Sequence, residues 1–167
     1  MTDTDGDGLT DGSEVNNYGT EPGNNDTDDD GVEDGDEIND YFTNATNSDS
    51  DNDGINDGEE LFTYGTNPNS NDTDTDGLLD LWELEGIFPN CTWENPTTGI
   101  VCDFNGDGLV DENDGTSPLS ADSDGGAVGD GVEIYVDESN PLDTDDDDTS
   151  DLDPVSYTHP RAHETDS

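Results

Sequence analysis

The first 83 residues alternate polar runs with isolated apolar side chains, which recur at fixed positions of a repeat that starts at residues 3, 26, 49 and 72. The apolar residues occupy positions 7, 13 and 16 of this 23-residue repeat: Leu9, Val15, Tyr18, Val32, Ile38, Tyr41, Ile55, Leu61 and Tyr64. Positions 13 and 16 lie about one helical turn apart, so the pattern predicts a short helical turn in each repeat. Three apolar side chains cannot form a core alone, and we expect them to seal each repeat against its neighbour.

Glycine and proline predict where each helical turn ends. Gly19 and Gly65 follow position 16 and suit the left-handed conformation that ends a helix. Pro22 and Pro68 then prevent the helix from continuing.

The polar runs contain the twelve-residue pattern D-x-D-x-D-G-x-x-D-x-x-E, which is typical of an EF-hand-like calcium loop. Aspartates at positions 1, 3 and 5 place three carboxylates around one hard cation, and the glycine at position 6 allows the sharp turn. Position 7 offers a backbone carbonyl, position 9 reaches the ion directly or through water, and the longer glutamate at position 12 can bind through both oxygens.

The pattern occurs four times in register, whereas acidic low-complexity sequence, the alternative interpretation, predicts no fixed period. It therefore indicates a calcium-stabilised irregular repeat array of Asp-rich loops and short helical turns, with little regular secondary structure. The predicted metal ligands are Asp3, Asp5, Asp7, Leu9, Asp11 and Glu14; Asp26, Asp28, Asp30, Val32, Asp34 and Glu37; Asp49, Asp51, Asp53, Ile55, Asp57 and Glu60; and Asp72, Asp74, Asp76, Leu78, Asp80 and Glu83.

A fifth loop at 103–114 has asparagine at position 3 and the shorter aspartate at position 12; its predicted ligands are Asp103, Asn105, Asp107, Leu109, Asp111 and Asp114. It resembles a dockerin loop, which makes a partner-binding module an alternative. Gly115 and Pro118 do not continue the long helix that a dockerin needs.

Two further loops are degenerate. The loop at 122–133 lacks the carboxylate at position 5 and the glycine at position 6, but keeps Asp122, Asp124, Asp130 and Glu133 as predicted ligands. The seventh loop, from Asp143, has Asp148 in place of glycine and Pro154 at position 12, so we expect weak binding there or none.

The sequence divides into four parts. Residues 1–83 hold the regular repeats, 84–102 form an insert, 103–154 hold the divergent repeats, and 155–167 differ in composition. That last segment resembles a translated sequencing adapter and is left out of the fold prediction; a metal-binding or targeting tail is the alternative. Met1 directly precedes the first loop without a secretory signal, so we expect a fragment of a longer protein.

Cys91 and Cys102 bracket the insert. The segment between them is short and contains proline and glycine, and two cysteines in this arrangement favour a disulfide. Buried free thiols remain an alternative, and a zinc site would need further His or Cys ligands, which are not nearby.

Composition limits the function. The 167 residues include 48 acidic side chains and one basic side chain, and only 25% are apolar, so bound metal must supply free energy that burial cannot. Residues 1–154 contain no Lys, Arg or His, which argues against nucleic-acid binding and against an enzyme. No stretch is long and apolar enough for direct membrane insertion.

The stretch 3–14, D-T-D-G-D-G-L-T-D-G-S-E, and the spacer Tyr-Gly-Thr-x-Pro at 18–22 and 64–68 resemble the bacterial relatives of the thrombospondin type 3 repeat. The resemblance covers about residues 3–151. It implies an extracellular calcium-binding array that serves as a stalk, spacer or adhesion module of a secreted or surface protein, with a surface partner bound through the parent protein. An acidic calcium buffer is the remaining alternative.

Overall fold

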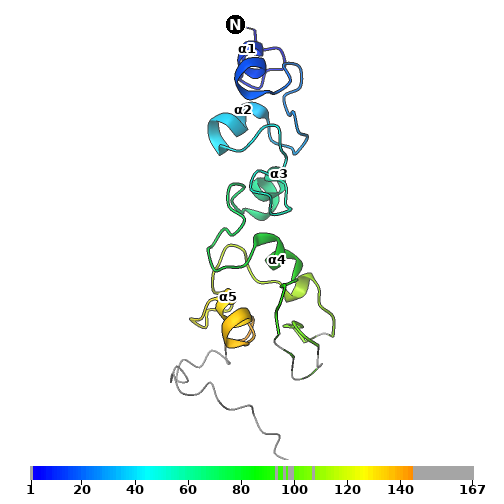
Figure 1. Ribbon diagram of the computed structural model, residues 1–167, viewed down its shortest axis with the longest axis vertical. Helices are drawn as coiled ribbons and strands as arrows, with labels where there is room; N and C mark the ends of the chain where they lie inside the picture. Colours follow the sequence, from blue (N-terminus) through cyan, green and yellow to red (C-terminus); the bar gives the residue numbers. More distant parts are fainter. Residues whose placement is uncertain (1, 93, 96, 98–99, 107, 145–167) are drawn as a thin grey trace, which may run out of the picture.

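The computed structural model describes residues 2–92, 94–95, 97, 100–106 and 108–144. Figure 1 shows an elongated stack in which α1, α2, α3 and α4 follow one another from the N-terminal end. At the other end α5 lies beside the segment that follows α4, so this base is wider than the rest of the stack. The adapter-like tail and most of the predicted seventh loop lie outside the described residues.

Four helices share one form. Each begins as a short α-helix at position 9 of a predicted calcium loop and continues directly as a five-residue π-helix. The pairs are α1 (Asp11–Ser13) with η1 (Glu14–Tyr18), α2 (Asp34–Asp36) with η2 (Glu37–Tyr41), α3 (Asp57–Glu59) with η3 (Glu60–Tyr64), and α5 (Asp130–Val132) with η5 (Glu133–Asp137). The base also contains α4 (Asp80–Glu85) and the 3₁₀-helix η4 (Glu112–Asp114). The described residues form one isolated β-bridge, Glu94 with Val101, and no strand. The predicted irregular repeat array with short helical turns is confirmed.

The helix ends follow the sequence prediction. Gly19 and Gly65 adopt left-handed conformations with φ of 84° and 81°. Their N–H groups donate to the carbonyls of Glu14 and Glu60, five residues back, at 2.7 Å. Phe42 takes the same role in the second repeat.

The apolar positions do not all become buried. Position 7 is buried in the first four repeats, at Leu9, Val32, Ile55 and Leu78. In contrast, Val15 is 64% exposed and Tyr18 is 40% exposed, so the prediction that positions 13 and 16 seal the first repeat is wrong. The reason is that the glutamate at position 12, Glu14, is fully buried, and position 13 is the next residue of the helix, so its side chain projects in a different direction.

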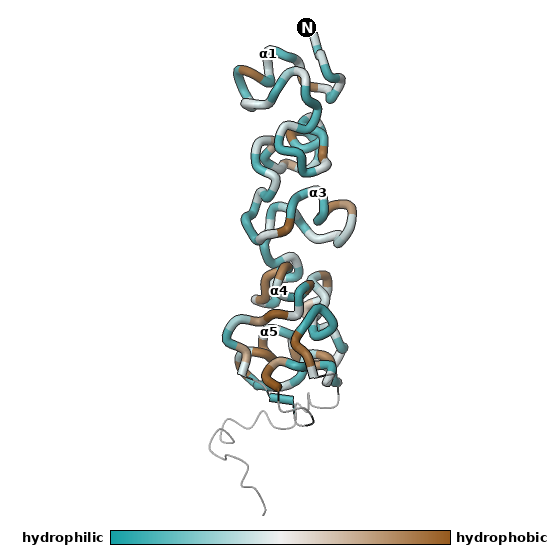
Figure 2. The backbone as a smooth tube through the Cα atoms, turned by 90° about the vertical axis from the view of Figure 1, so that its right-hand side faces the viewer, coloured by the Kyte–Doolittle hydropathy of each residue, from teal (hydrophilic) through white to brown (hydrophobic). Residues whose placement is uncertain are grey.

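The base contains a conventional hydrophobic core. Leu78, Phe88, Cys102, Phe104 and Ile134 are buried together, and Trp82 and Cys91 pack against them. The Phe88 and Phe104 rings lie 5.7 Å apart between centroids. Figure 2 shows the contrast, with hydrophobic segments gathered around α4 and α5 and scattered in the upper repeats.

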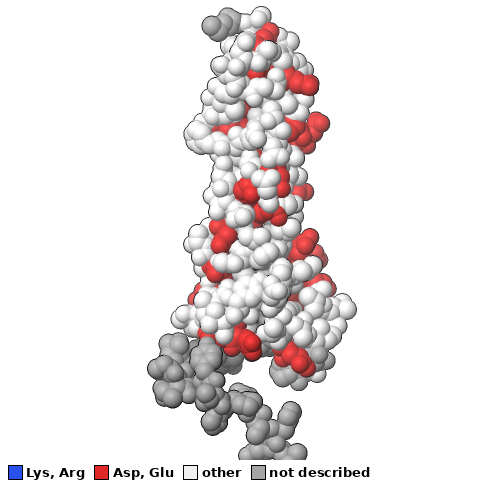
Figure 3. Space-filling view, viewed as in Figure 1, with Lys and Arg blue, Asp and Glu red and all other residues white. Residues whose placement is uncertain are grey.

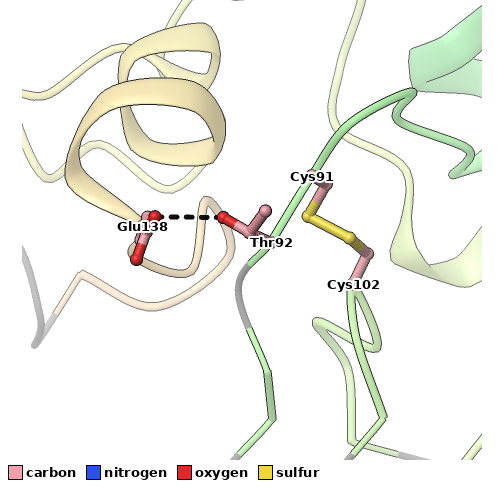
Figure 4. Close-up of a disulfide and its surroundings, with 4 residues drawn as sticks. All are labelled: Cys91, Thr92, Cys102 and Glu138. Carbon is pink, nitrogen blue, oxygen red and sulfur yellow. Dashed lines mark hydrogen bonds between the residues drawn. A yellow bond between two sulfur atoms is a disulfide. The ribbon is translucent and has the colours of Figure 1, made fainter.

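The predicted disulfide is present in the structure, with Cys91 bonded to Cys102 (Figure 4). The neighbouring Thr92 hydroxyl donates to Glu138 at 3.0 Å. The insert at 84–102 is thereby held both to itself and to the last described repeat.

The regular array stops after Glu83 and resumes at Gly115. In the second and third repeats a threonine six residues after the loop glutamate donates to it, as Thr66 donates to Glu60 at 3.1 Å. Glu83 instead receives this bond from Thr116, 33 residues later, at 2.9 Å. The sequence Gly115-Thr-Ser-Pro118 thus occupies the place of Gly65-Thr-Asn-Pro68. The predicted boundary between residues 102 and 103 lies inside the interrupting segment, which also contains the fifth loop.

Candidate metal centres

The first three carboxylates of each regular loop converge. One oxygen from each of positions 1, 3 and 5 lies within 4.8 Å of the others in the loops that begin at Asp3, Asp26 and Asp49. Backbone N–H groups fix the position-1 carboxylate: Asn52 and Gly54 donate to its two oxygens in the third loop, at 2.7 and 3.1 Å. The loop backbone therefore holds the carboxylates together despite their mutual repulsion.

A second cluster lies between consecutive repeats. Asp7 and Glu14 of the first loop meet Asp34 of the second within 4.8 Å, and Asp30 and Glu37 meet Asp57 of the third in the same way. The sequence prediction assigned position 9 to its own loop. The structure places it beside positions 5 and 12 of the preceding loop, so each junction gathers acidic residues from two repeats.

A hydroxyl residue at position 2 holds the position-9 carboxylate in place. In the third loop, the N–H of Ser50 donates to one oxygen of Asp57 at 2.8 Å, and its hydroxyl donates to the other at 2.6 Å. The same pair of bonds links Thr27 to Asp34 and Thr73 to Asp80. These hydroxyls were not predicted from the sequence, although Ser or Thr recurs at position 2 of all four regular loops.

Many carboxylate oxygens in these clusters are buried without a hydrogen-bond donor. They include Oδ2 of Asp7, Asp30 and Asp53, Oε2 of Glu37, Glu60 and Glu83, and both oxygens of Glu14. A buried carboxylate with no donor and no cationic side chain is strongly unfavourable. A cation with oxygen ligands would satisfy these atoms, so the residues present fit calcium.

The pKa values of several junction carboxylates are raised. Burial, together with the charges of neighbouring aspartates, raises the pKa of Glu37, Glu60 and Glu83 to about 8. Burial also raises the pKa of Asp30 and Asp53 to about 6. Figure 3 shows patches of acidic side chains along the stack and no basic side chain on the visible described surface.

The fourth loop forms its junction with the loop at 122–133, which follows the interrupting segment. The N–H of Gly131 donates to Asp76 at 3.0 Å, and Asp130 is fully buried beside it. The backbone of Gly131 meets the Asp76 carbonyl as Gly58 meets the Asp30 carbonyl. The degenerate loop 122–133 therefore takes the position of the next repeat after the fourth loop, and it contributes Asp130 to that junction.

The fifth loop is arranged differently. Asp103 and Asp114 are fully buried, but Asn105 is exposed and its N–H donates to Asp114 at 3.0 Å. Asp111 accepts from the N–H of Asn113 and caps η4. Asp107 lies outside the described residues. The backbone carbonyls predicted as ligands at position 7 (Leu9, Val32, Ile55, Leu78 and Leu109) stay predictions.

Glycine at position 10 allows the close approach of consecutive repeats. A Cβ added to Gly35 would lie 1.8 Å from the carbonyl oxygen of Asp7, and one added to Gly58 would lie 2.2 Å from that of Asp30. The equivalent Gly12 has nothing within 4 Å. Sequence reasoning missed this role, although glycine recurs at position 10 of the first three loops.

Replacing Gly58 with alanine is expected to separate the second and third repeats. The new methyl group would meet backbone, so the cost is that of overpacking, about 1–3 kcal/mol. The calcium-saturated Gly58→Ala variant should therefore unfold at a lower temperature. Gly12→Ala is the matched control and should be neutral or slightly stabilising, because alanine favours helix. Equal melting temperatures in the two variants would contradict the close contact.

Comparison with known proteins supports the repeat assignment. Residues 3–24 and 49–71 match the family model of the bacterial TSP3 repeat. The predicted resemblance is therefore confirmed in these two segments.

Among solved structures, the chain is similar to one described as "Biofilm associated protein - B domain", with 42% identity over 27% of this chain and 11% of that chain and a TM-score of 0.27. It is also similar to one described as "Biofilm associated protein - BSP domain", with 44% identity over 26% of this chain and 7% of that chain and a TM-score of 0.26. The matches thus span a small part of those proteins. A comparison with curated proteins found no match.

Proposed function

We propose that the chain is a calcium-binding repeat array that acts as a structural stalk, spacer or adhesion module of an extracellular or surface protein. The observation that carries the proposal is the set of buried carboxylate oxygens without hydrogen-bond donors. Each loop would hold one ion with positions 1, 3 and 5, and each junction would hold another with positions 5 and 12 and the next position 9. Bound calcium would neutralise these groups and join consecutive repeats.

The ligand chemistry favours calcium over other metals. The clusters offer oxygen atoms only, and the region 1–154 contains no histidine, which argues against zinc. Mg²⁺ demands tight octahedral geometry and keeps its waters, so it suits these carboxylate-rich clusters poorly. We expect affinities in the range of extracellular calcium modules, about 10⁻⁴–10⁻³ M.

One further observation supports the extracellular role. The Cys91–Cys102 disulfide is typical of oxidising compartments. In the described part of the chain no helix is long and apolar enough to cross a membrane. A protein partner would be bound through the parent protein, and we propose no catalytic role for the array.

Calcium titration followed by calorimetry tests the proposal. We expect more than one ion for each regular repeat, because both the loops and the junctions would be filled. The acidic-buffer alternative would give weak binding that physiological salt removes, without any change in shape. The dockerin alternative requires a long helix after the fifth loop, whereas η4 ends at Asp114 and Gly115 is extended.

Calcium binding is expected to strengthen as the pH rises from 6 to 9 and to release protons at pH 7. Glu83 lies in the base, whose hydrophobic core we expect to persist without calcium; its pKa there is about 8 against an ordinary value of 4.5, so protonation stabilises the ion-free base fully below pH 4.5. This stabilisation is lost as the pH rises through 8, where calcium no longer has a proton to displace. Calorimetry in two buffers of different ionisation enthalpy measures the released protons.

Variants at neighbouring residues control the pH experiment. Glu83→Gln should reduce the proton release because the titrating group is gone. Glu85→Gln should leave it unchanged, since Glu85 is exposed and lies outside the clusters. A calcium affinity that does not vary with pH would contradict the assignment of the buried glutamates as ligands.

A further inference from the structure

A groove with a volume of about 700 Å³ lies between the third repeat, α4 and the segment just before η4. Its apolar lining comprises Ile55, Tyr64, Leu81, Leu84, Ile87 and Val110. Ile87 is 51% exposed and Val110 is 42% exposed, so these two side chains are accessible, whereas Ile55 is buried. The volume falls in the range of ligand-binding pockets, about 300–1,000 Å³.

Close backbone packing fixes the walls of the groove. Gly86 ends α4 with φ of 65°, and a Cβ at this position would lie 2.0 Å from the carbonyl oxygen of Asp111. This contact seats the segment before η4 against the end of α4. On the other side, the Leu81 side chain lies over Gly54, 2.9 Å from the place of a Cβ. The groove is therefore formed by packed elements and needs no rearrangement to exist.

The rim of the groove is acidic. Glu59, Glu85 and Glu112 line it, and all three are exposed. None occupies a ligand position of a calcium loop, so their charges remain when the loops are filled. The region 1–154 contains no basic side chain to neutralise them.

We propose that this groove docks a peptide segment of a partner protein that carries bulky apolar side chains flanked by lysine or arginine. The apolar floor would bury the hydrophobic side chains, at about 25 cal/mol per Å² of apolar surface removed from water. The acidic rim selects the cationic flanks and repels anionic lipid and nucleic acid. The interrupting segment supplies Leu84, Ile87 and Val110, and the third repeat supplies Ile55 and Tyr64.

Fluorescence anisotropy on the full chain tests the proposal, in millimolar calcium and about 150 mM salt to screen non-specific attraction. The probe is a labelled peptide of about eight alternating lysines and leucines. Two further peptides replace leucine with serine or lysine with glutamate. We expect binding of the lysine–leucine peptide at least tenfold tighter than either of these. Equal binding of the lysine–serine peptide would show charge attraction alone and overturn the proposal.

Two sets of variants locate the site. Ile87→Ser combined with Val110→Ser should weaken binding at least tenfold, whereas the exposed control pair Val15→Ser and Val136→Ser should leave it unchanged.

Glu59→Gln, Glu85→Gln and Glu112→Gln together should also weaken binding and leave the calcium-bound circular dichroism spectrum intact. Unchanged binding in the rim variant would refute the groove even if the apolar variant failed to fold. Since calcium-induced compaction is measured separately, failure of the groove and failure of the calcium array can be distinguished.

Discussion

Removal of calcium is expected to expand the chain from an ordered stack to an open coil. In EDTA the radius of gyration should rise toward about 43 Å, the value for an unfolded chain of this length. The buried apolar residues of the upper three repeats are few, namely Leu9, Val32, Ala45 and Ile55, while each repeat buries several carboxylates. Without an ion these carboxylates repel one another, and burial of so little apolar surface cannot compensate. Small-angle scattering with EDTA and then with millimolar calcium measures the change.

The expansion should not be uniform along the chain. The base keeps the core around Phe88 and Phe104 and the Cys91–Cys102 disulfide, so it should retain more order in EDTA than the repeats above it. Hydrogen exchange should therefore show the fastest amides in the first three repeats. Magnesium at the same concentration is the control and should restore the compact state poorly. A radius of gyration unchanged by EDTA would contradict the proposed function.

The repeat spacing and the chemistry of the loops could be read from the sequence because both depend on local pattern. The period of the aspartates predicted the loops, the glycines after position 16 predicted the helix ends, and Cys91 and Cys102 predicted the disulfide. All of these features involve residues close together in the chain. Propensity and spacing carry information at that range.

The contacts between repeats could not be read in the same way. The sequence predicted that apolar side chains would seal the repeats. Val15 and Tyr18 are exposed instead, and the junctions bury acidic residues and glycine, although the rings of Tyr41 and Phe62 do meet between the second and third repeats. Asp34 and Asp57 follow a loop pattern that assigns them to their own loops, and only the stacking geometry turns them toward the preceding repeat. The contact between Glu83 and Thr116 likewise depends on how the chain returns after the interruption. Careful comparison of the polar positions in the repeat would have revealed the recurring threonines and glycines, though not their partners.

The position-9 aspartate offers a sharp test of how the repeats are coupled, because it belongs to one loop and lies in the cluster of another. Asp57→Asn keeps the size of the side chain and an oxygen that can accept from the Ser50 N–H, but it removes a charge from the cluster of Asp30 and Glu37. We expect calcium binding at the junction between the second and third repeats to weaken at least tenfold, about 1.4 kcal/mol or more. The loss should also reduce thermal stability, since stability in such arrays includes terms from neighbouring interfaces.

Two backbone amides distinguish the alternatives in a calcium titration followed by NMR. The N–H of Val32 donates to Asp30 in the second loop, and that of Ile55 donates to Asp53 in the third, each at 2.8 Å. If Asp57 serves the preceding loop, the Asp57→Asn variant should need more calcium to shift the Val32 signal, while the Ile55 signal changes less. A larger effect at Ile55 would show that the position-9 aspartate serves its own loop. Asp11→Asn is the matched control: it is the same substitution at position 9 of the first loop, outside the cluster of Asp30 and Glu37, and it should leave both signals unchanged.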